Sequence, residues 1–332
     1  MDEALLTDWL RQASGHAALT IRARELLTGG AIQQNWALQV AWPGGQEDWV
    51  LRTDSAAVLA VSLPRRAEFA LLQVAYAAGV TVPEPLFLCD DLSVTGAPFF
   101  VMRRVAGITA GHRLVKSDSL GGGRAALVRR LGQELARIHT IRPPQPKLGF
   151  LGVPPVDACL AFIANSRAAL DRQRAPRPVL EWGLRHLELN APEPLPPVLC
   201  HNDFRTGNLM VTEQALTAVL DWEFAAWGEP HADLGWLCAP CWRFGNHLRE
   251  VGGIGDRADL YAGYEAGSGQ VVDPERVRWW ELAATIRWAL IAIDQAERFL
   301  SGTECSLELA LTGHLVPGLE WNILDMVEAA HA

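Results

Sequence analysis

The segment that most constrains this chain is a run of polar residues between two short apolar stretches. It reads Leu199-Cys200-His201-Asn202-Asp203-Phe204-Arg205-Thr206-Gly207-Asn208-Leu209, and Val219-Leu220-Asp221-Trp222-Glu223 follows. The apolar stretches favour short strands, with the polar residues in the loop between them. Such a hairpin can present Asp203, Asn208 and Asp221 to a single point.

The residue types in this hairpin suit phosphoryl transfer. A carboxylate such as Asp203 can accept the proton of an attacking hydroxyl group. Oxygens from Asn208 and Asp221 are the ligands that a hard cation such as magnesium prefers. The alternative is a polar hairpin that binds nothing, because Asp and Asn are common in ordinary turns. The combined pattern favours the catalytic interpretation.

The chain before about residue 104 has the pattern of a small sheet with one main helix. Candidate strands occupy residues 19–27, 36–42, 49–52, 85–89 and 99–102. Pro64 opens a helical pattern that continues through Ala78. The N-terminal Leu6 and Leu10 suit one face of a further short helix.

The later part of the chain is mainly helical. From about residue 124, apolar residues recur at helical spacing, and a strand is expected at 218–220. The proline-rich stretches 143–155 and 174–197 predict loops. We therefore predict an α+β fold with a small lobe at 1–104 and a larger helical lobe at 105–332. A ligand is expected in the cleft between them.

Composition excludes several classes of protein. Of 332 residues, 49% are hydrophobic and 20% charged, which is enough to build a substantial core. A net charge of −9 without a basic run argues against a nucleic-acid partner. The acidic start lacks the layout of a signal peptide, and the apolar run Trp288–Ile293 is too short to span a membrane. Six scattered cysteines predict a reduced, cytoplasmic protein.

The polar hairpin resembles the aminoglycoside phosphotransferase and choline kinase-like family, whose members are distant relatives of protein kinases. The resemblance rests on the His-x-Asp-x-x-x-x-Asn array at 201–208, on Leu-Asp-Trp-Glu at 220–223 and on Gly-Glu-Pro-His-Ala-Asp-Leu-Gly-Trp at 228–236. It extends from about Leu26 to beyond Arg298. In detail the chain is most similar to the subgroup that includes the kinase-like domains of certain acyl-CoA dehydrogenases.

The resemblance implies a protein-kinase-like, two-lobed fold. It also implies transfer of a phosphoryl group from ATP, with magnesium, to the hydroxyl of a small molecule. Asp203 would orient or deprotonate that hydroxyl, and Asn208 and Asp221 would hold the magnesium. His201 would be a structural member of the loop, or simply a satisfied core histidine. Arg205 could contact phosphate, or could be a solvated loop arginine.

One further acidic residue has an implied role in the loop. Asp233 would anchor the loop from below by accepting backbone hydrogen bonds. The alternative for Asp233 is the N-cap of a helix that begins at Leu234.

The resemblance also implies a nucleotide site in the small lobe. Its residues would be Gly29, Gly30 and Asn35 over the phosphates, Arg52 and Glu68 as the cation–carboxylate pair, and Met102 beside the adenine. Glycines let backbone N–H groups approach anionic oxygen, although a plain hairpin turn has the same composition. Arginine replaces the lysine of kinases at position 52, and it can still bind carboxylate or phosphate through two N–H groups. The alternative for this pair is a surface ion pair.

The sequence says less about the identity of the acceptor than about the fold. An aminoglycoside, an amino alcohol, a sugar and a hydroxyacyl compound all remain candidates. The acidic balance mildly favours cationic acceptors, whereas tryptophans after the loop, such as Trp236 and Trp242, could line an apolar or cation-binding pocket. Two other functions stay open. One is a catalytically weak nucleotide-binding pseudokinase or scaffold, because Arg52 replaces lysine, and the other is a redox or metal protein built on Cys238 and Cys241.

Overall fold

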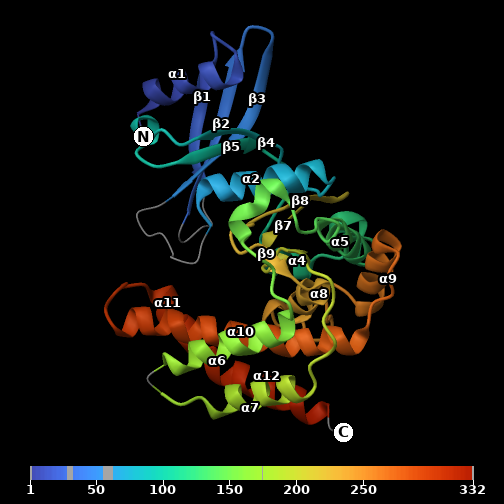
Figure 1. Cartoon of the computed structure of the whole chain (residues 1–332). Coiled ribbons are helices and arrows are strands. Elements are labelled where there is room, and N and C mark those ends of the chain that lie inside the picture. The colour runs from blue at the N-terminus through green and yellow to red at the C-terminus, as the bar shows by residue number, and fades with distance from the viewer. Residues whose placement is uncertain (1, 28–32, 55–62, 174, 331–332) are drawn as a thin grey trace.

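The computed structural model describes residues 2–27, 33–54, 63–173 and 175–330. The predicted nucleotide-binding residues Gly29 and Gly30 lie outside the described residues. A five-stranded antiparallel sheet comes first, and a mainly helical region follows it (Figure 1). The predicted α+β class is therefore confirmed.

The sheet has the strand order β1-β2-β3-β5-β4, with every neighbouring pair antiparallel. The elements of this part are α1 Glu3–Ser14, β1 Thr20–Leu27, β2 Gln33–Trp42, β3 Gly45–Asp54, α2 Arg65–Ala77, β4 Pro85–Cys89, α3 Leu92–Thr95 and β5 Phe99–Arg103. Each strand overlaps its predicted range. Gly44 has a φ of 93°, so the β2–β3 turn needs glycine there.

Helices α1 and α2 cover opposite faces of the sheet. Successive residues of a strand point to opposite faces. On β5, Phe99 accordingly packs in one cluster with Leu6 and Leu10 of α1. Phe100 turns to the other face, where its ring centroid lies 5.8 Å from that of Phe69 on α2. The α2 cluster continues into the helical region, so one core joins the sheet to the helices that follow.

The helical region contains nine α-helices among its described residues and two small two-stranded sheets, β6–β9 and β7–β8. Its elements are α4 Gly111–Lys116, α5 Arg124–Ile138, α6 Ala158–Asp171, α7 Pro178–Leu189, β6 Val198–Cys200, β7 Leu209–Val211, β8 Leu216–Val219, β9 Ala226–Gly228, α8 Pro230–Cys238, α9 Arg257–Ser268, α10 Pro274–Leu300, α11 Leu307–Gly313 and α12 Val316–Ala329. Helices α6, α7, α10 and α12 share a second core around Ile286 and Ile323.

Two expected loops are wrong. The stretch 174–197 contains α7, which begins at Pro178. Proline is favoured at the first helical position, so a proline-rich segment can open a helix. The stretch 143–155 contains a 3₁₀ helix over Pro146–Leu151. The strand expected at 218–220 is β8, which ends at Val219.

Helices α8 and α10 pack unusually closely below the polar hairpin. A Cβ atom at Gly235 of α8 would lie 2.6 Å from the Trp280 backbone of α10. Glycine at this position therefore allows the contact, which brings the site helix α8 against the long helix α10. Among the described residues, no helix is long and apolar enough to cross a membrane.

Candidate active site

The hairpin from β6 to just past the end of β8 carries the predicted base, Asp203, and the two predicted magnesium ligands, Asn208 and Asp221. Asp203 and Asn208 both lie in the loop between β6 and β7, and Asp221 follows the end of β8. The backbone N–H of Leu220 donates to the carbonyl oxygen of Asn208 at 2.9 Å. The Asn208 carboxamide nitrogen also donates to Asp203 Oδ2 at 2.6 Å. Asn208 therefore links Asp203 to the backbone immediately before Asp221, whose own side chain contacts Arg52.

The carboxylate of Asp203 is buried and held on both oxygens. Oδ1 accepts from Trp236 Nε1 at 3.1 Å and from Arg205 Nε at 3.0 Å, and Oδ2 accepts from Asn208. Burial raises the pKa of Asp203, because it disfavours the charged form. The donors around it, with Arg205 first among the charged groups, oppose that effect. The group is thus a fixed carboxylate with increased basicity.

His201 lies under the loop and both of its ring nitrogens are engaged. Nδ1 accepts the backbone N–H of Asp203 at 3.2 Å, and the Nε2–H group donates to the Leu220 carbonyl at 3.0 Å. Burial lowers its pKa, which favours the neutral imidazole that this pattern requires. His201 therefore links the two arms of the hairpin and positions Asp203.

The backbone of the site adopts a conformation that is uncommon for residues other than glycine. Asn202 has a φ of 61° and Asp221 a φ of 69°. Asn202 is held there by its side-chain bond to the Phe224 carbonyl at 3.2 Å and by the Arg287 guanidinium, which donates to its carbonyl at 3.1 Å. Such conformations persist where surrounding contacts fix them, and they concentrate at functional sites.

Asp233 anchors the catalytic loop from below. Its Oδ2 accepts the backbone N–H of His201 at 2.7 Å, and its Oδ1 accepts that of Asn202 at 2.8 Å. Burial opposes ionisation, but the hydrogen bonds from His139 and from the backbone lower the pKa of Asp233. The expected anchoring contacts are confirmed, and the alternative N-cap role is wrong because α8 begins three residues earlier, at Pro230.

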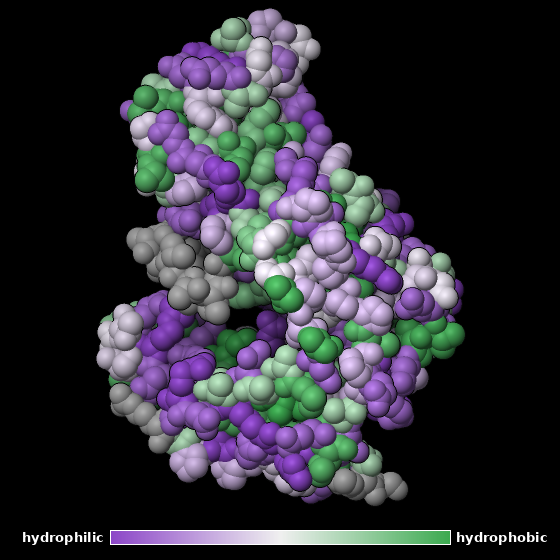
Figure 2. Space-filling view, in the orientation of Figure 1, coloured by the Kyte–Doolittle hydropathy of each residue, from purple (hydrophilic) through white to green (hydrophobic). Residues whose placement is uncertain are grey.

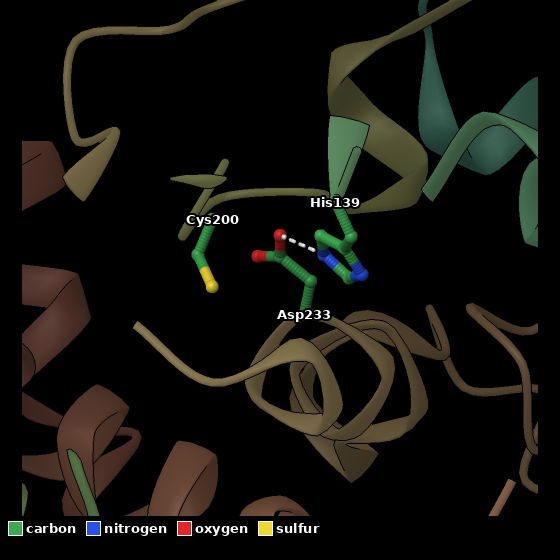
Figure 3. A group of neighbouring side chains, drawn as sticks. All are labelled: His139, Cys200 and Asp233. Atoms are coloured by element: carbon green, nitrogen blue, oxygen red, sulfur yellow. Dashed lines mark hydrogen bonds and ion pairs between the residues drawn. The ribbon is translucent and has the colours of Figure 1, made fainter. Parts of the chain in front are cut away.

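Asp233 also belongs to a cluster whose ligand atoms lie within 4.8 Å of one another (Figure 3). His139 comes from the end of α5, Cys200 from the end of β6 and Asp233 from α8. His139 bonds Asp233 through Nε2 at 3.3 Å and Tyr264 through Nδ1 at 2.9 Å. The Cys200 thiol donates to a backbone carbonyl at 3.2 Å, and burial raises its pKa well above the ordinary value. These atoms already have partners, so the cluster supports the loop without a metal.

The cation–carboxylate pair of the small lobe extends to the catalytic hairpin. Arg52 Nε lies 2.9 Å from Glu68 Oε1, and Arg52 Nη2 lies 2.7 Å from Asp221 Oδ1. Burial opposes the charge, but Glu68 and Asp221 raise the pKa of Arg52. The pair is buried and joins β3 to α2, so the alternative of a surface ion pair is wrong. Arg65 also contacts Glu68, and its Nε lies 2.9 Å from Asp54 Oδ1.

The other predicted nucleotide residues lie on the sheet. Asn35 of β2 is opposite Arg52 of β3 in the register. Its side-chain oxygen is buried and has no hydrogen bond with any described residue. Met102 of β5 is opposite Val50 and is partly buried against the core. The structure places Asn35 beside Arg52, and it places Met102 against the core cluster that includes Phe204 and Leu209.

Three residues of the site lay outside the predicted set. Trp236, weighed only as a pocket aromatic, donates to Asp203. Arg287, on α10, donates to the loop backbone and lies over the Trp236 ring at 4.7 Å. Arg65 shares Glu68 with Arg52. The one sequence signal for Arg287 is its place as a charged residue within the apolar run of α10.

The cysteine pair has the features of packing residues. Cys238 is fully buried, Cys241 is partly buried, and neither forms a disulfide. Burial raises the pKa of Cys238 to about 12 and raises that of Cys241 as well. A redox thiol needs a lowered pKa, so burial of these thiols disfavours the redox interpretation. In the part of the chain that is described, neither Cys238 nor Cys241 belongs to a group of side chains that could hold a metal ion.

A model of the APH phosphotransferase enzyme family matches residues 24–280. Acyl-CoA dehydrogenase family member 11 of Rattus norvegicus is 28% identical over 273 residues, which make up 76% of this chain and 34% of that protein. Family member 10 of Mus musculus is 33% identical over 182 residues, 52% of this chain and 16% of that protein. The chain thus spans about a third or less of the length of these relatives.

Solved structures share the fold along nearly the whole chain. A provisionally assigned aminoglycoside phosphotransferase of Ralstonia eutropha has a TM-score of 0.76 at 22% identity, covering 99% of this chain and 98% of its own. Aminoglycoside phosphotransferase APH(4)-Ia, in a complex with AMP-PNP and hygromycin B, has a TM-score of 0.62 at 14% identity, with 97% of each chain covered. At these identities the likeness shows the fold alone, and it confirms the protein-kinase-like class.

Proposed function

Because the chain belongs to the APH phosphotransferase enzyme family, we propose that it transfers the γ-phosphoryl group of ATP to a hydroxyl group of a small molecule. The observation that supports this most directly is the hairpin in which Asn208 bonds both the Asp203 carboxylate and the backbone just before Asp221. This hairpin carries two carboxylates and a carboxamide, and the buried Arg52 contacts one of the carboxylates, that of Asp221. These are the groups that phosphoryl transfer requires.

The proposed chemistry assigns one task to each group. Asp203 accepts the proton of the acceptor hydroxyl group while the oxygen of that hydroxyl group bonds to the γ-phosphorus. The bond from that phosphorus to the β–γ bridging oxygen breaks, and ADP leaves. Arg52, held by Glu68, supplies N–H donors to the phosphates. Trp236 and His201 keep the Asp203 carboxylate and its backbone in position.

The donor set of the hairpin fits magnesium. The Asn208 carboxamide nitrogen faces Asp203, and its oxygen has no hydrogen bond with any described residue. Asp221 is 31% exposed at its side chain, so one carboxylate remains accessible. Asn208 and Asp221 would hold the ion, and a bound magnesium would neutralise charge that develops on the phosphates.

One observation favours a second candidate, a nucleotide-binding pseudokinase. Arg52 Nη2 lies 2.7 Å from Asp221 Oδ1 and therefore engages the carboxylate that magnesium would need. If this contact persisted with nucleotide present, metal binding and transfer would both be weak. A measured turnover separates the two functions, since only the phosphotransferase releases ADP in proportion to acceptor.

The first test is a screen of hydroxyl compounds for ADP release from MgATP. We expect acceptor-dependent release in the wild type and a fall of about 10²- to 10⁴-fold in Asp203→Asn, because the carboxamide cannot accept the proton. Nucleotide binding, measured by calorimetry, should be retained in this variant. Unchanged ADP release in Asp203→Asn would contradict the assigned role. The absence of both ATP binding and ADP release in the wild type would overturn the function.

The pH profile provides a second test of the site. Trp236→Phe removes an N–H group that donates to ionised Asp203, so the pKa of Asp203 should rise further. Because the base must be ionised, activity should then be lost at a higher pH than in the wild type as the solution is made acidic. The measurement is ADP release with an acceptor from the screen, between about pH 4 and 8.

Trp242→Phe is the matched control for this measurement. The Trp242 ring lies 4.7 Å below the Arg205 guanidinium, and its Nε1 has no hydrogen bond with any described residue. Phenylalanine keeps the aromatic face, so activity should be lost at the same acidic pH as in the wild type. Equal profiles in all three proteins would argue against a positioning role for Trp236.

A further inference from the structure

A pocket beside Asp203 has the size and place of an acceptor site. Its volume is about 670 Å³, and it is lined mainly by α6, α8, α10 and residues 223–226. Figure 2 shows a hollow above α10 on this face of the molecule. Two lining residues, Asn202 and Trp236, are also in contact with the catalytic group: Asn202 precedes Asp203 in the chain, and Trp236 donates to its carboxylate. The pocket therefore opens next to the proposed base.

The walls of the pocket are mostly apolar. Phe162, Trp236, Trp280 and Leu290 supply the large side chains, and several alanines fill the rest. Ligand sites commonly combine such walls with a few polar groups that fix orientation. Those polar groups decide which acceptors can bind.

Among the described residues that line the pocket, two carry charge, Glu223 and Arg287. Glu223 interacts electrostatically with Arg52, whose pKa it helps to raise, so that arginine partly balances its charge. Arg287 remains as the cation of the acceptor side. Burial lowers the pKa of Arg287, in line with a guanidinium that is poorly solvated.

The Arg287 guanidinium has N–H donors that are available to a ligand. It donates through Nη1 to the Asn202 carbonyl, and it lies over the Trp236 ring. No carboxylate of a described residue lies within ion-pair distance of it. The acidic groups that act on it at longer range are Asp203 and Asp233, and both already accept several hydrogen bonds. A guanidinium has five N–H donors, so most of its hydrogen-bonding capacity remains for a ligand.

We propose that the acceptor carries a carboxylate or a similar anionic group, besides its reactive hydroxyl, and that Arg287 binds this group. The proposal rests on the proposed function and names its substrate class. Arg287 is only partly exposed, and a partly buried cation without a close counter-ion is costly, a cost that an anionic ligand relieves. Guanidinium also matches the two oxygens of a carboxylate. The same charge disfavours polyamine acceptors, contrary to the mild preference that the overall charge suggests.

The test compares acceptors that differ only in one terminal charge. Straight-chain hydroxycarboxylates of three to ten carbons are paired with amino alcohols and diols of equal length. For each compound, ADP release from MgATP gives kcat/KM, and calorimetry with a non-hydrolysable ATP analogue gives binding. The best hydroxycarboxylate should exceed the amino alcohol of its length by at least about tenfold, as expected for a hydrogen-bonded charge.

Two variants of Arg287 and one control connect the preference to this residue. Arg287→Met should bring the ratio between carboxylate and amine close to one, and Arg287→Lys should retain part of it. The ratio compares two acceptors on the same protein, so partial loss of folded protein does not change it. Arg278→Met removes an exposed arginine from the same helix and should leave the ratio at its wild-type value.

Three outcomes would overturn the proposal. Amino alcohols could be preferred by the wild type, the carboxylate preference could persist in Arg287→Met, or no carboxylate of the panel could bind. In the first two cases acceptor-dependent ADP release continues, so the proposed function survives while this inference fails. Loss of ATP binding and of all ADP release would instead count against the function itself.

Discussion

Asp221→Asn is expected to lower kcat/KM by at least about 10³-fold, because it removes the carboxylate that would hold magnesium. Asp221 follows β8 in a conformation with positive φ, and its side chain is partly exposed between Arg52 and the loop. Asparagine tolerates that backbone conformation well. The substitution therefore changes the charge at the proposed metal position while the hairpin keeps its shape.

Binding measurements distinguish a metal role from a general loss of activity. In the wild type, magnesium should tighten ATP binding, and chelation should reverse the effect. In Asp221→Asn, affinity for ATP alone should be similar or higher, since Arg52 loses one of its two carboxylate partners and keeps Glu68. The dependence on magnesium should be largely lost.

Asp90→Asn is a matched control, because Asp90 also pairs with an arginine, Arg66, but on the exposed surface. It should leave both ATP binding and turnover near the wild-type level. If Asp221→Asn kept the full response to magnesium, Asp221 would not be a metal ligand. The Arg52–Asp221 contact would then be a structural ion pair.

The elements that the sequence predicted best are those with local signals. The strands of the sheet follow from short apolar runs between turn residues, and α2 follows from Pro64 and a buried face at helical spacing. Helix α7 was missed because prolines on both sides favoured a loop, although Pro178 stands at its first turn. Strand β7 has three residues, too few for a periodic pattern.

The residues of the site also differ in how well the sequence predicts them. Asp203, Asn208 and Asp221 lie within nineteen positions of one another, so their spacing was visible in the chain. Arg287 contacts the loop from α10, a helix that packs closely against α8 at Gly235. The hydrogen bond from Arg287 to the Asn202 carbonyl joins residues 85 positions apart in the chain, and no local sequence pattern predicts it. The catalytic motif was therefore predictable, while the residue that we assign to acceptor selection required the packed structure.

Asp233→Asn should destabilise the protein by roughly 3–5 kcal/mol, the range for breaking a buried charged network. The Asp233 carboxylate is fully buried and accepts a backbone N–H on each oxygen, from His201 and from Asn202. Asparagine has one acceptor oxygen, and its NH₂ group would face the second N–H donor. That donor would be left buried without a partner. Urea unfolding followed by tryptophan fluorescence measures the loss.

Asp259→Asn is the control for this measurement, because Asp259 also lies in the first turn of a helix but pairs with the exposed Arg129. Its cost should stay below about 1 kcal/mol. The pKa of Asp233 is lower in the folded protein than in the unfolded chain, so its contribution is complete above the unfolded value of about 3.9. The stability difference between wild type and Asp233→Asn should therefore be constant from pH 7 to about pH 5 and shrink as the pH falls below about 4. A difference that did not depend on pH in the acid range would mean that the charge on Asp233 does not hold the catalytic loop.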